Sequence, residues 1–206
     1  IKPKIMKRRI TRVMLSAALV AAWGVPLMAQ QTEKPVADML DIKFNADGSA
    51  EDVSPMKLDV QTIQIGNPGV STYYNDAYGA VVGRFDNTWG ANNSSGYRID
   101  YGDNEDFISK LSDGHTLETV CMADYSAVQD VEIKPFSSME GGGTGFLITT
   151  ISGSRQNEIC FLPNTTLTGN SVWRWATSGV VPERGKFYHV IGVYDAENNK
   201  ARIYVD

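Results

Sequence analysis

The sequence predicts an all-β fold, a two-sheet antiparallel sandwich of the jelly-roll type, preceded by an N-terminal signal helix. Many short runs alternate apolar and polar residues, which is typical of half-buried strands. Clusters of Gly, Asn, Pro and Ser separate these runs, and only residues 104–111 look helical. A chain of 206 residues, of which 42% are hydrophobic and 21% charged, is typical of one globular domain.

Residues 1–29 predict a secretory signal peptide. Four basic residues between positions 7 and 12 precede an apolar run at 13–25, which Pro26 and the small residue Ala29 follow. A bilayer crossing needs about 20 apolar residues, so this shorter run indicates a cleaved leader and no stable membrane span after cleavage. We therefore expect a secreted, periplasmic or cell-surface protein.

Removal of the leader would make the chain strongly acidic. The leader holds six of the 19 Lys and Arg residues and no acid, which leaves 13 basic against 24 acidic residues and a net charge of −11. Such a surface repels phosphate backbones, so we expect no nucleic-acid partner. Neutral glycans, cations and proteins remain as ligand classes. After the leader, we expect a linker at 30–37 and one domain at 38–206.

The strands of this domain are predicted in order by the alternating runs. Residues 39–44 form the first, and the turn sequence Asn45-Ala46-Asp47-Gly48 ends it. The other predicted strands are 60–65, 79–85, 116–122, 145–151, 158–162, 171–176, 187–194 and 200–205. One face of each longer strand must pack on a partner sheet while the other meets solvent or ligand. Because the last run stops in mid-pattern, we expect the domain to be truncated at its C-terminus.

The chain has two cysteines, Cys121 and Cys160. In an exported domain they form one disulfide if the fold brings their Cα atoms within about 7 Å. The alternative is two small buried side chains on separate strands.

Two segments resemble laminin G-like domains of the concanavalin A-like lectin and glucanase superfamily. Residues 185–195 (GKFYHVIGVYD) and 201–206 (ARIYVD) resemble the C-terminal hairpin of that family. Residues 114–120 (GHTLETV) are similar to an early strand of the family, with Thr119 and Val120 in place of a small and an aromatic residue. The resemblance covers about residues 38–206 and implies a jelly roll that binds sugars, proteins or Ca²⁺.

The segments at 52–56 and 136–139 look like parts of secreted Bacteroidetes proteins that join such a module to a calcineurin-like phosphoesterase. The function that follows is an exported, non-catalytic binding module that recognises carbohydrate or protein. The alternative is an accessory domain of a larger hydrolase, a metallophosphoesterase or glycan hydrolase, whose catalytic domain lies beyond residue 206.

Aromatic residues are the candidate ligand contacts. Trp89, Tyr73 and Tyr74 fall in a loop-rich region between residues 66 and 96, where binding residues tend to lie on a rigid scaffold. Trp173 and Trp175 lie on one side of a predicted strand. Their indoles either stack on sugar rings or fill the sandwich core.

An acidic segment around the predicted helix is the candidate metal site. Asp100, Asp103, Asn104 and Asp106 supply oxygen atoms of the kind that Ca²⁺ prefers. The alternative is a plain helix N-terminus, where acids favour the helix dipole.

The sequence predicts no catalytic site. Asp130 and Glu132 are two carboxylates on one side of a strand, but no third carboxylate follows, so we expect a solvated strand face. Residues 102–106 match the Gly-Asp-x-x-Asp element of calcineurin-like phosphoesterases, yet neither His115 nor His189 stands in the histidine motifs that such sites also need.

His189 lies in a mainly apolar predicted strand. Ile191 and Val193 are its neighbours on the same side of that strand. We therefore predict a core or interface histidine that is satisfied by hydrogen bonds and has no catalytic partner.

Overall fold

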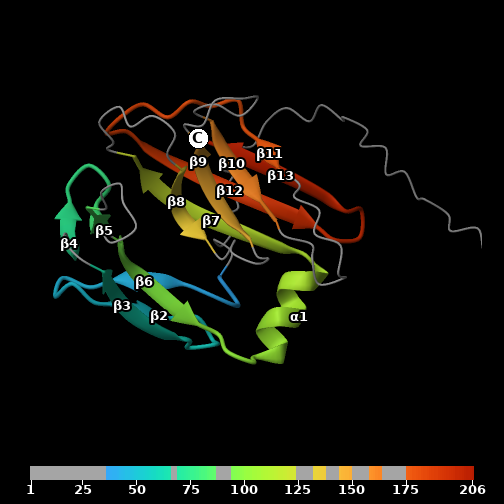
Figure 1. Ribbon diagram of the computed structural model, residues 1–206, viewed down its shortest axis with the longest axis horizontal. Helices are drawn as coiled ribbons and strands as arrows, with labels where there is room; N and C mark the ends of the chain where they lie inside the picture. The colour runs from blue at the N-terminus through green and yellow to red at the C-terminus, as the bar shows by residue number, and fades with distance from the viewer. Residues whose placement is uncertain are drawn as a thin grey trace, which may run out of the picture. The chain divides into compact units, whose positions relative to one another are not determined.

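The computed structural model describes residues 36–65, 69–86, 94–123, 132–137, 144–149, 158–163 and 175–206. The all-β prediction is confirmed for this part of the chain, which contains thirteen strands and one helix (Figure 1). All of these elements belong to one compact unit, Ala37–Asp206. The predicted signal helix lies outside the described residues.

The described strands pair only in antiparallel fashion and form five sheets. Three are two-stranded: β1 (Ile42–Phe44) with β2 (Ala50–Asp52), β3 (Asp59–Ile65) with β6 (Ser94–Asp100), and β4 (Val70–Asn75) with β5 (Ala80–Phe85). A four-stranded sheet has the order β11 (Ala176–Thr177), β10 (Ile159–Leu162), β9 (Gly145–Thr149), β8 (Glu132–Ser137). A three-stranded sheet has the order β13 (Lys200–Val205), β12 (Phe187–Asp195), β7 (His115–Met122).

Sequence patterning found the strands that alternate apolar and polar residues and missed several that do not. The prediction of a loop-rich region at 66–96 is wrong at β4 (VSTYYN) and at the start of β6 (SSGYRID), whereas the strand predicted at 79–85 is confirmed as β5. β4 and β6 contain Ser, Asn or Gly, which are typical of turns. The predicted strand 171–176 lies outside the described residues up to position 174, and β11 begins at its last residue, Ala176.

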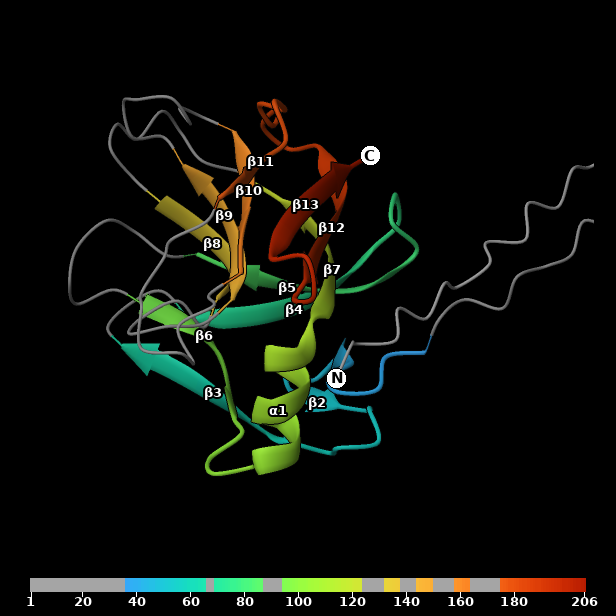
Figure 2. The same ribbon diagram turned by 90° about the vertical axis from the view of Figure 1, so that its right-hand side faces the viewer.

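The two larger sheets pack face to face around the main hydrophobic core (Figure 2). Phe146 of β9 and Phe161 of β10 face Tyr188 and Val190 of β12, and all four are buried. Residues of β12 alternate between this buried side and a more exposed side. This alternation is the two-faced pattern of a sandwich strand.

Gly192 lets the two sheets approach closely. A Cβ atom at this position of β12 would lie 2.4 Å from Cδ2 of Phe161, nearer than real contacts allow. The ring of Phe161 therefore packs directly on the backbone of β12, and it also contacts Phe146 at 5.6 Å between ring centroids. Any side chain at this position would push the sheets apart.

A second, smaller aromatic cluster holds the remaining ladders together. Phe44 of β1 lies 5.5 Å from Tyr97 of β6 and 6.5 Å from Phe85 of β5, measured between ring centroids. The hydroxyl of Tyr97 donates to the carbonyl of Gly48, and the hydroxyl of Thr72 in β4 donates to that of Asn45. The β4–β5 hairpin is thus fixed to the β1–β2 hairpin at its base.

The helix α1 (Glu105–Asp113) is bounded by specific residues at both ends. The side chain of Asn104 accepts from the backbone NH of Phe107, which is an N-cap. Gly114 ends the helix at φ 114°, and a Cβ atom there would lie 2.9 Å from the carbonyl oxygen of Tyr194. The chain therefore turns directly into β7.

Asp52 organises the segment that follows β2. Its buried carboxylate accepts from the backbone NH groups of Asp41, Ser54 and Leu58 and from the hydroxyl of Ser54, over distances of 2.8 to 3.0 Å. Burial alone raises the pKa of Asp52, but these hydrogen bonds outweigh burial and hold the pKa below its usual value.

The disulfide alternative is wrong for this structure. Cys121 lies on the buried side of β7 and Cys160 lies in β10, and both described side chains carry thiols. Burial raises the pKa of Cys121 to about 11, which keeps it protonated and unreactive near neutral pH. The two cysteines thus behave as small core side chains.

Gly192→Ala is expected to lower the free energy of unfolding by about 1–3 kcal/mol, because the new methyl group collides with the ring of Phe161. Urea titration followed by circular dichroism measures this. Gly96→Ala in β6 is the matched control, since the Cβ position there is open, and it should change stability little. Equal losses in both variants would refute the close sheet contact.

Asp52→Asn is expected to cost about 2–4 kcal/mol, because an amide cannot accept all the hydrogen bonds that the carboxylate accepts. Since the folded-state pKa is lowered, the carboxylate's extra stability is complete above pH 3.8 and is lost as the pH falls below it. Denaturant midpoints measured from pH 2 to pH 7 should therefore converge for wild type and variant at low pH. Glu51→Gln, an exposed change in the same strand, should leave the profile unaltered.

Candidate ligand-binding face

An imidazole and a carboxylate form a pair on the outer side of the three-stranded sheet. Nε2 of His189 in β12 lies 2.8 Å from Oε1 of Glu118 in β7, and both side chains are partly exposed. The two residues are 71 positions apart in sequence, and the antiparallel register places Glu118 opposite Ile191. His189 is therefore not a core histidine, and the prediction that it is satisfied by a hydrogen bond is confirmed.

The neighbours of this pair define a surface that we call the His189 face. Alternation along β7, β12 and β13 puts every second residue on the side away from the core. The His189 face consists of Thr116, Glu118, Val120, Met122, Phe187, His189, Ile191, Val193, Asp195, Lys200, Arg202, Tyr204 and Asp206.

The His189 face is slightly acidic, like the chain as a whole. It holds three acidic side chains, Glu118, Asp195 and Asp206, and two basic ones, Arg202 and Lys200. A guanidinium nitrogen of Arg202 lies 3.6 Å from Oδ2 of Asp195. The hydrogen bonds from Asn198, and then the positive charges of Arg202 and Lys200, hold the pKa of Asp195 below its usual value.

Exposed aromatic side chains gather on the β4–β5 hairpin. We call Tyr73, Tyr74, Tyr78 and Phe85 the hairpin aromatics; Tyr74 is the most exposed at 61% and Tyr78 is 46% exposed. Tyr73 and Tyr74 are adjacent on one strand, so their rings lie on opposite faces of the hairpin. The structure thus places both predicted residues on a strand, where their rings cannot contact the same face of a ligand.

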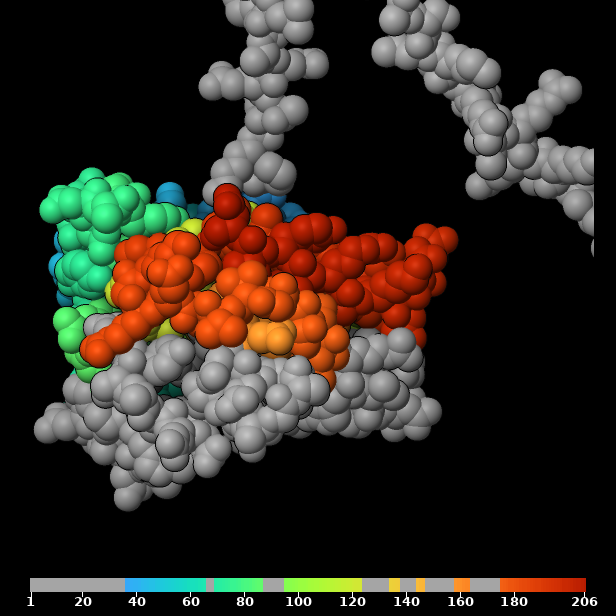
Figure 3. Space-filling view, turned by 90° about the horizontal axis from the view of Figure 1, so that it is seen from above, coloured from blue at the N-terminus to red at the C-terminus, as the bar shows by residue number. Residues whose placement is uncertain are grey.

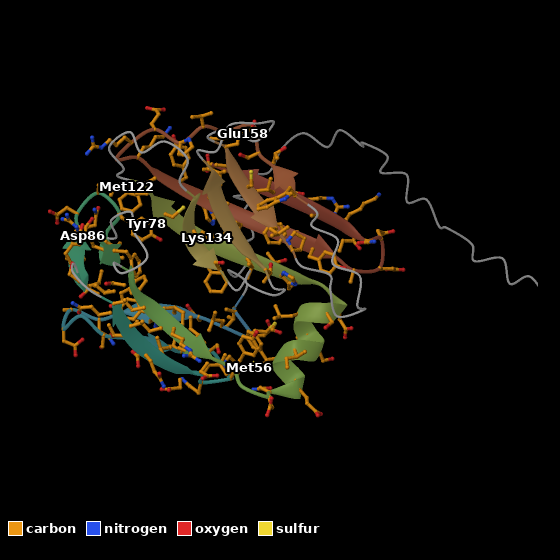
Figure 4. The ribbon with its side chains drawn as sticks, in the orientation of Figure 1. Met56, Tyr78, Asp86, Met122, Lys134 and Glu158 are labelled. Atoms are coloured by element: carbon orange, nitrogen blue, oxygen red, sulfur yellow. The ribbon has the colours of Figure 1, made fainter. Side chains whose placement is uncertain are left out.

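The hairpin and the His189 face meet at Tyr78. Its ring stacks on that of Phe187, the first residue of β12, with ring centroids 5.6 Å apart and an interplanar angle of 21°. Figure 3 shows the green hairpin beside the orange segment that leads into β12. Figure 4 shows Tyr78 close to Met122, the β7 residue opposite Phe187. The two surfaces are therefore continuous.

The predicted tryptophan contacts are only partly described. Trp89 and Trp173 lie outside the described residues. Trp175 immediately precedes β11 and packs, half-buried, against the fully buried Leu162. Its position fits the alternative in which this indole fills the core.

The predicted metal-site residues make hydrogen bonds and ion pairs of their own. Asp100 accepts from the backbone NH of Gly102 at 3.0 Å and pairs with Arg98 at 3.4 Å. Asp106 pairs with Lys110 at 3.3 Å, one turn further along α1. Asp103, like its neighbours, lies in the turn that leads into the helix. The Ca²⁺ site stays a prediction, and these contacts, with the Asn104 N-cap, fit the helix N-terminus alternative.

The described ranges contain no cluster of three or more His, Cys, Asp or Glu side chains arranged to hold a metal ion. Their one helix, α1, is too short to cross a membrane. Of the two carboxylates on the predicted strand face, Asp130 lies outside the described residues and Glu132 begins β8.

His115 is the second histidine and lies on the core side of β7. Its Nδ1–H donates to the carbonyl of Leu111 at 2.9 Å, and its Nε2 accepts from the hydroxyl of Thr144 at 2.9 Å. Because a carbonyl only accepts, Nδ1 carries a proton, and burial favours the neutral ring, in which Nε2 is the acceptor. Burial lowers the pKa of His115, although the bond to Leu111 opposes that effect.

Comparison with known proteins gives no relative for this chain: no family model, curated protein or solved structure matches it. The laminin G-like family and its link to a phosphoesterase therefore stay predictions.

The buried, neutral His115 is expected to make stability depend on pH. With a lowered folded-state pKa, its contribution is complete above pH 6.5 and is lost as the pH falls below that value, because the unfolded chain then binds the proton more readily. Thermal unfolding between pH 7 and pH 5 measures this. His115→Gln should flatten the profile. A profile that keeps its wild-type slope in this variant would overturn the assignment.

Proposed function

We propose that this domain is an exported, non-catalytic binding module that recognises carbohydrate through the hairpin aromatics. The observation that carries the proposal is the gathering of Tyr73, Tyr74 and Tyr78 within one short, exposed hairpin. Single exposed aromatics are common on protein surfaces, whereas a cluster indicates a ligand. Tyrosine offers a flat apolar ring for the carbon face of a sugar and a hydroxyl for hydrogen bonding.

The attachment of the hairpin supports binding with little conformational cost. Thr72 donates to the carbonyl of Asn45 at 2.6 Å, and the rings of Phe85 and Tyr97 lie 5.9 Å apart in the second aromatic cluster. At the tip, Asn75 accepts from the backbone NH of Tyr78 and receives the NH of Gly79 at its carbonyl. A strand held in this way loses less freedom on binding than a mobile loop would.

The charge of the chain favours a neutral ligand. The sequence carries 24 acidic against 19 basic residues, and the excess of acid grows if the predicted leader is removed. A surface of this sign disfavours polyanions and leaves neutral glycans as the matching ligand. The resemblance to laminin G-like domains, some of which bind sugars, agrees with this ligand class.

Tyr74→Ala is expected to weaken glycan binding by about tenfold, the equivalent of one stacked ring at about 1.4 kcal/mol. Calorimetric titration or a glycan array with purified protein measures this. Tyr74→Phe should bind nearly as wild type, because the ring is kept. Tyr73→Ala, on the opposite face of the hairpin, shows whether one face or both contact the glycan. An unchanged affinity in Tyr74→Ala would remove this residue from the site, and no binding to any glycan would refute the function.

A further inference from the structure

We infer that the ligand is a neutral, extended glycan of several sugar units, which runs from the hairpin aromatics onto the His189 face. This inference rests on the proposed function and names the ligand class and a second part of the site. The Glu118–His189 pair would bind sugar hydroxyls there, and Tyr204 would supply a second exposed ring.

The continuity of the surface sets the direction in which the glycan runs. The stack of Tyr78 on Phe187 joins the hairpin to the first residue of β12. His189 and Ile191 follow at every second position on the same side of that strand. Four residues of strand extend over roughly 13 Å. One sugar ring cannot reach from the hairpin to Ile191, so only a glycan of several units contacts both surfaces.

Hydrogen-bonding chemistry at the pair suits a hydroxyl group. Glu118 accepts the Nε2–H of His189 at 2.8 Å and thereby fixes the orientation and tautomer of the ring. In that tautomer Nδ1 is the acceptor of the ring, and the partly exposed imidazole offers it for a hydroxyl proton. A sugar hydroxyl donates and accepts, so it matches an acceptor beside a carboxylate.

Apolar groups beside the pair suit the carbon face of a sugar. Tyr204 of β13 is 56% exposed and stands opposite Ile191 on the neighbouring strand. Val120 stands opposite His189 on the other side. Rings and branched side chains next to hydrogen-bonding groups are the usual composition of small-ligand sites.

Charge on the His189 face selects against anionic ligands. Three acids, Glu118, Asp195 and Asp206, stand against Arg202 and Lys200, and Arg202 already lies 3.6 Å from Asp195. A sulfated or carboxylated glycan, or an acidic peptide, gains no net attraction from such a face. A neutral polyhydroxyl chain is not repelled by this face.

The test compares neutral glucose oligosaccharides of two and six units, in several linkages, by calorimetric titration against the purified chain. Wild type should bind the best six-unit ligand at least about tenfold more tightly than its two-unit form. His189→Ala and Glu118→Ala should each remove this gain and leave the two-unit affinity unchanged. The double variant should lose no more than either single change, because the two residues act as one pair.

Controls separate loss of binding from loss of folding. The melting temperature of each variant is measured without ligand, and Thr62→Ala, an exposed change on β3 outside both surfaces, should keep the full gain. A sulfated glucan of matched length should bind no more tightly than the neutral chain.

The outcomes distinguish this inference from the function on which it rests. If binding depends on Tyr74 but six units bind no better than two, or if His189→Ala keeps the gain, the inference fails and the binding module stands. Tighter binding of the sulfated chain overturns the neutral ligand class. If no oligosaccharide binds a folded wild type, both proposals fail.

Discussion

The contact between the ring of Phe161 and the bare backbone at Gly192 is the constraint on which the larger sandwich depends. A Cβ atom at Gly192 would lie 2.4 Å from that ring, so the two sheets meet closely at this point only because β12 has no side chain there. The same contact fixes which side of β12 is buried. Since side chains alternate along a strand, His189 and Ile191 then must lie on the opposite, accessible side.

The smaller aromatic cluster has a comparable role for the β4–β5 hairpin. Phe44 and Tyr97 hold Phe85 at the base of the hairpin, while Tyr74 and Tyr78 near its tip stay exposed. Aromatic packing thus stabilises the base of the hairpin, and the tip presents exposed rings. The stack of Tyr78 on Phe187 joins this element to the main sheet, so two separately stabilised parts form one continuous surface.

The two histidines show how environment separates residues of one type. His115 faces the core, uses both ring nitrogens within the protein and is held neutral by burial. His189 lies on the outer side of the sheet and pairs with Glu118 at a partly exposed position. The first therefore contributes to stability, and the second is placed where a ligand can reach it.

The sequence by itself determined the all-β class, most strand positions and the helix that begins after Asn104, because these follow from local periodicity and capping. It missed β4 and β6, whose composition resembles that of turns, and so placed Tyr73 and Tyr74 in a loop. Only the tertiary structure decided that Glu118 meets His189 and that Tyr78 meets Phe187. These pairs join residues more than 70 positions apart, and strand register and sheet packing, which no local pattern encodes, bring them together.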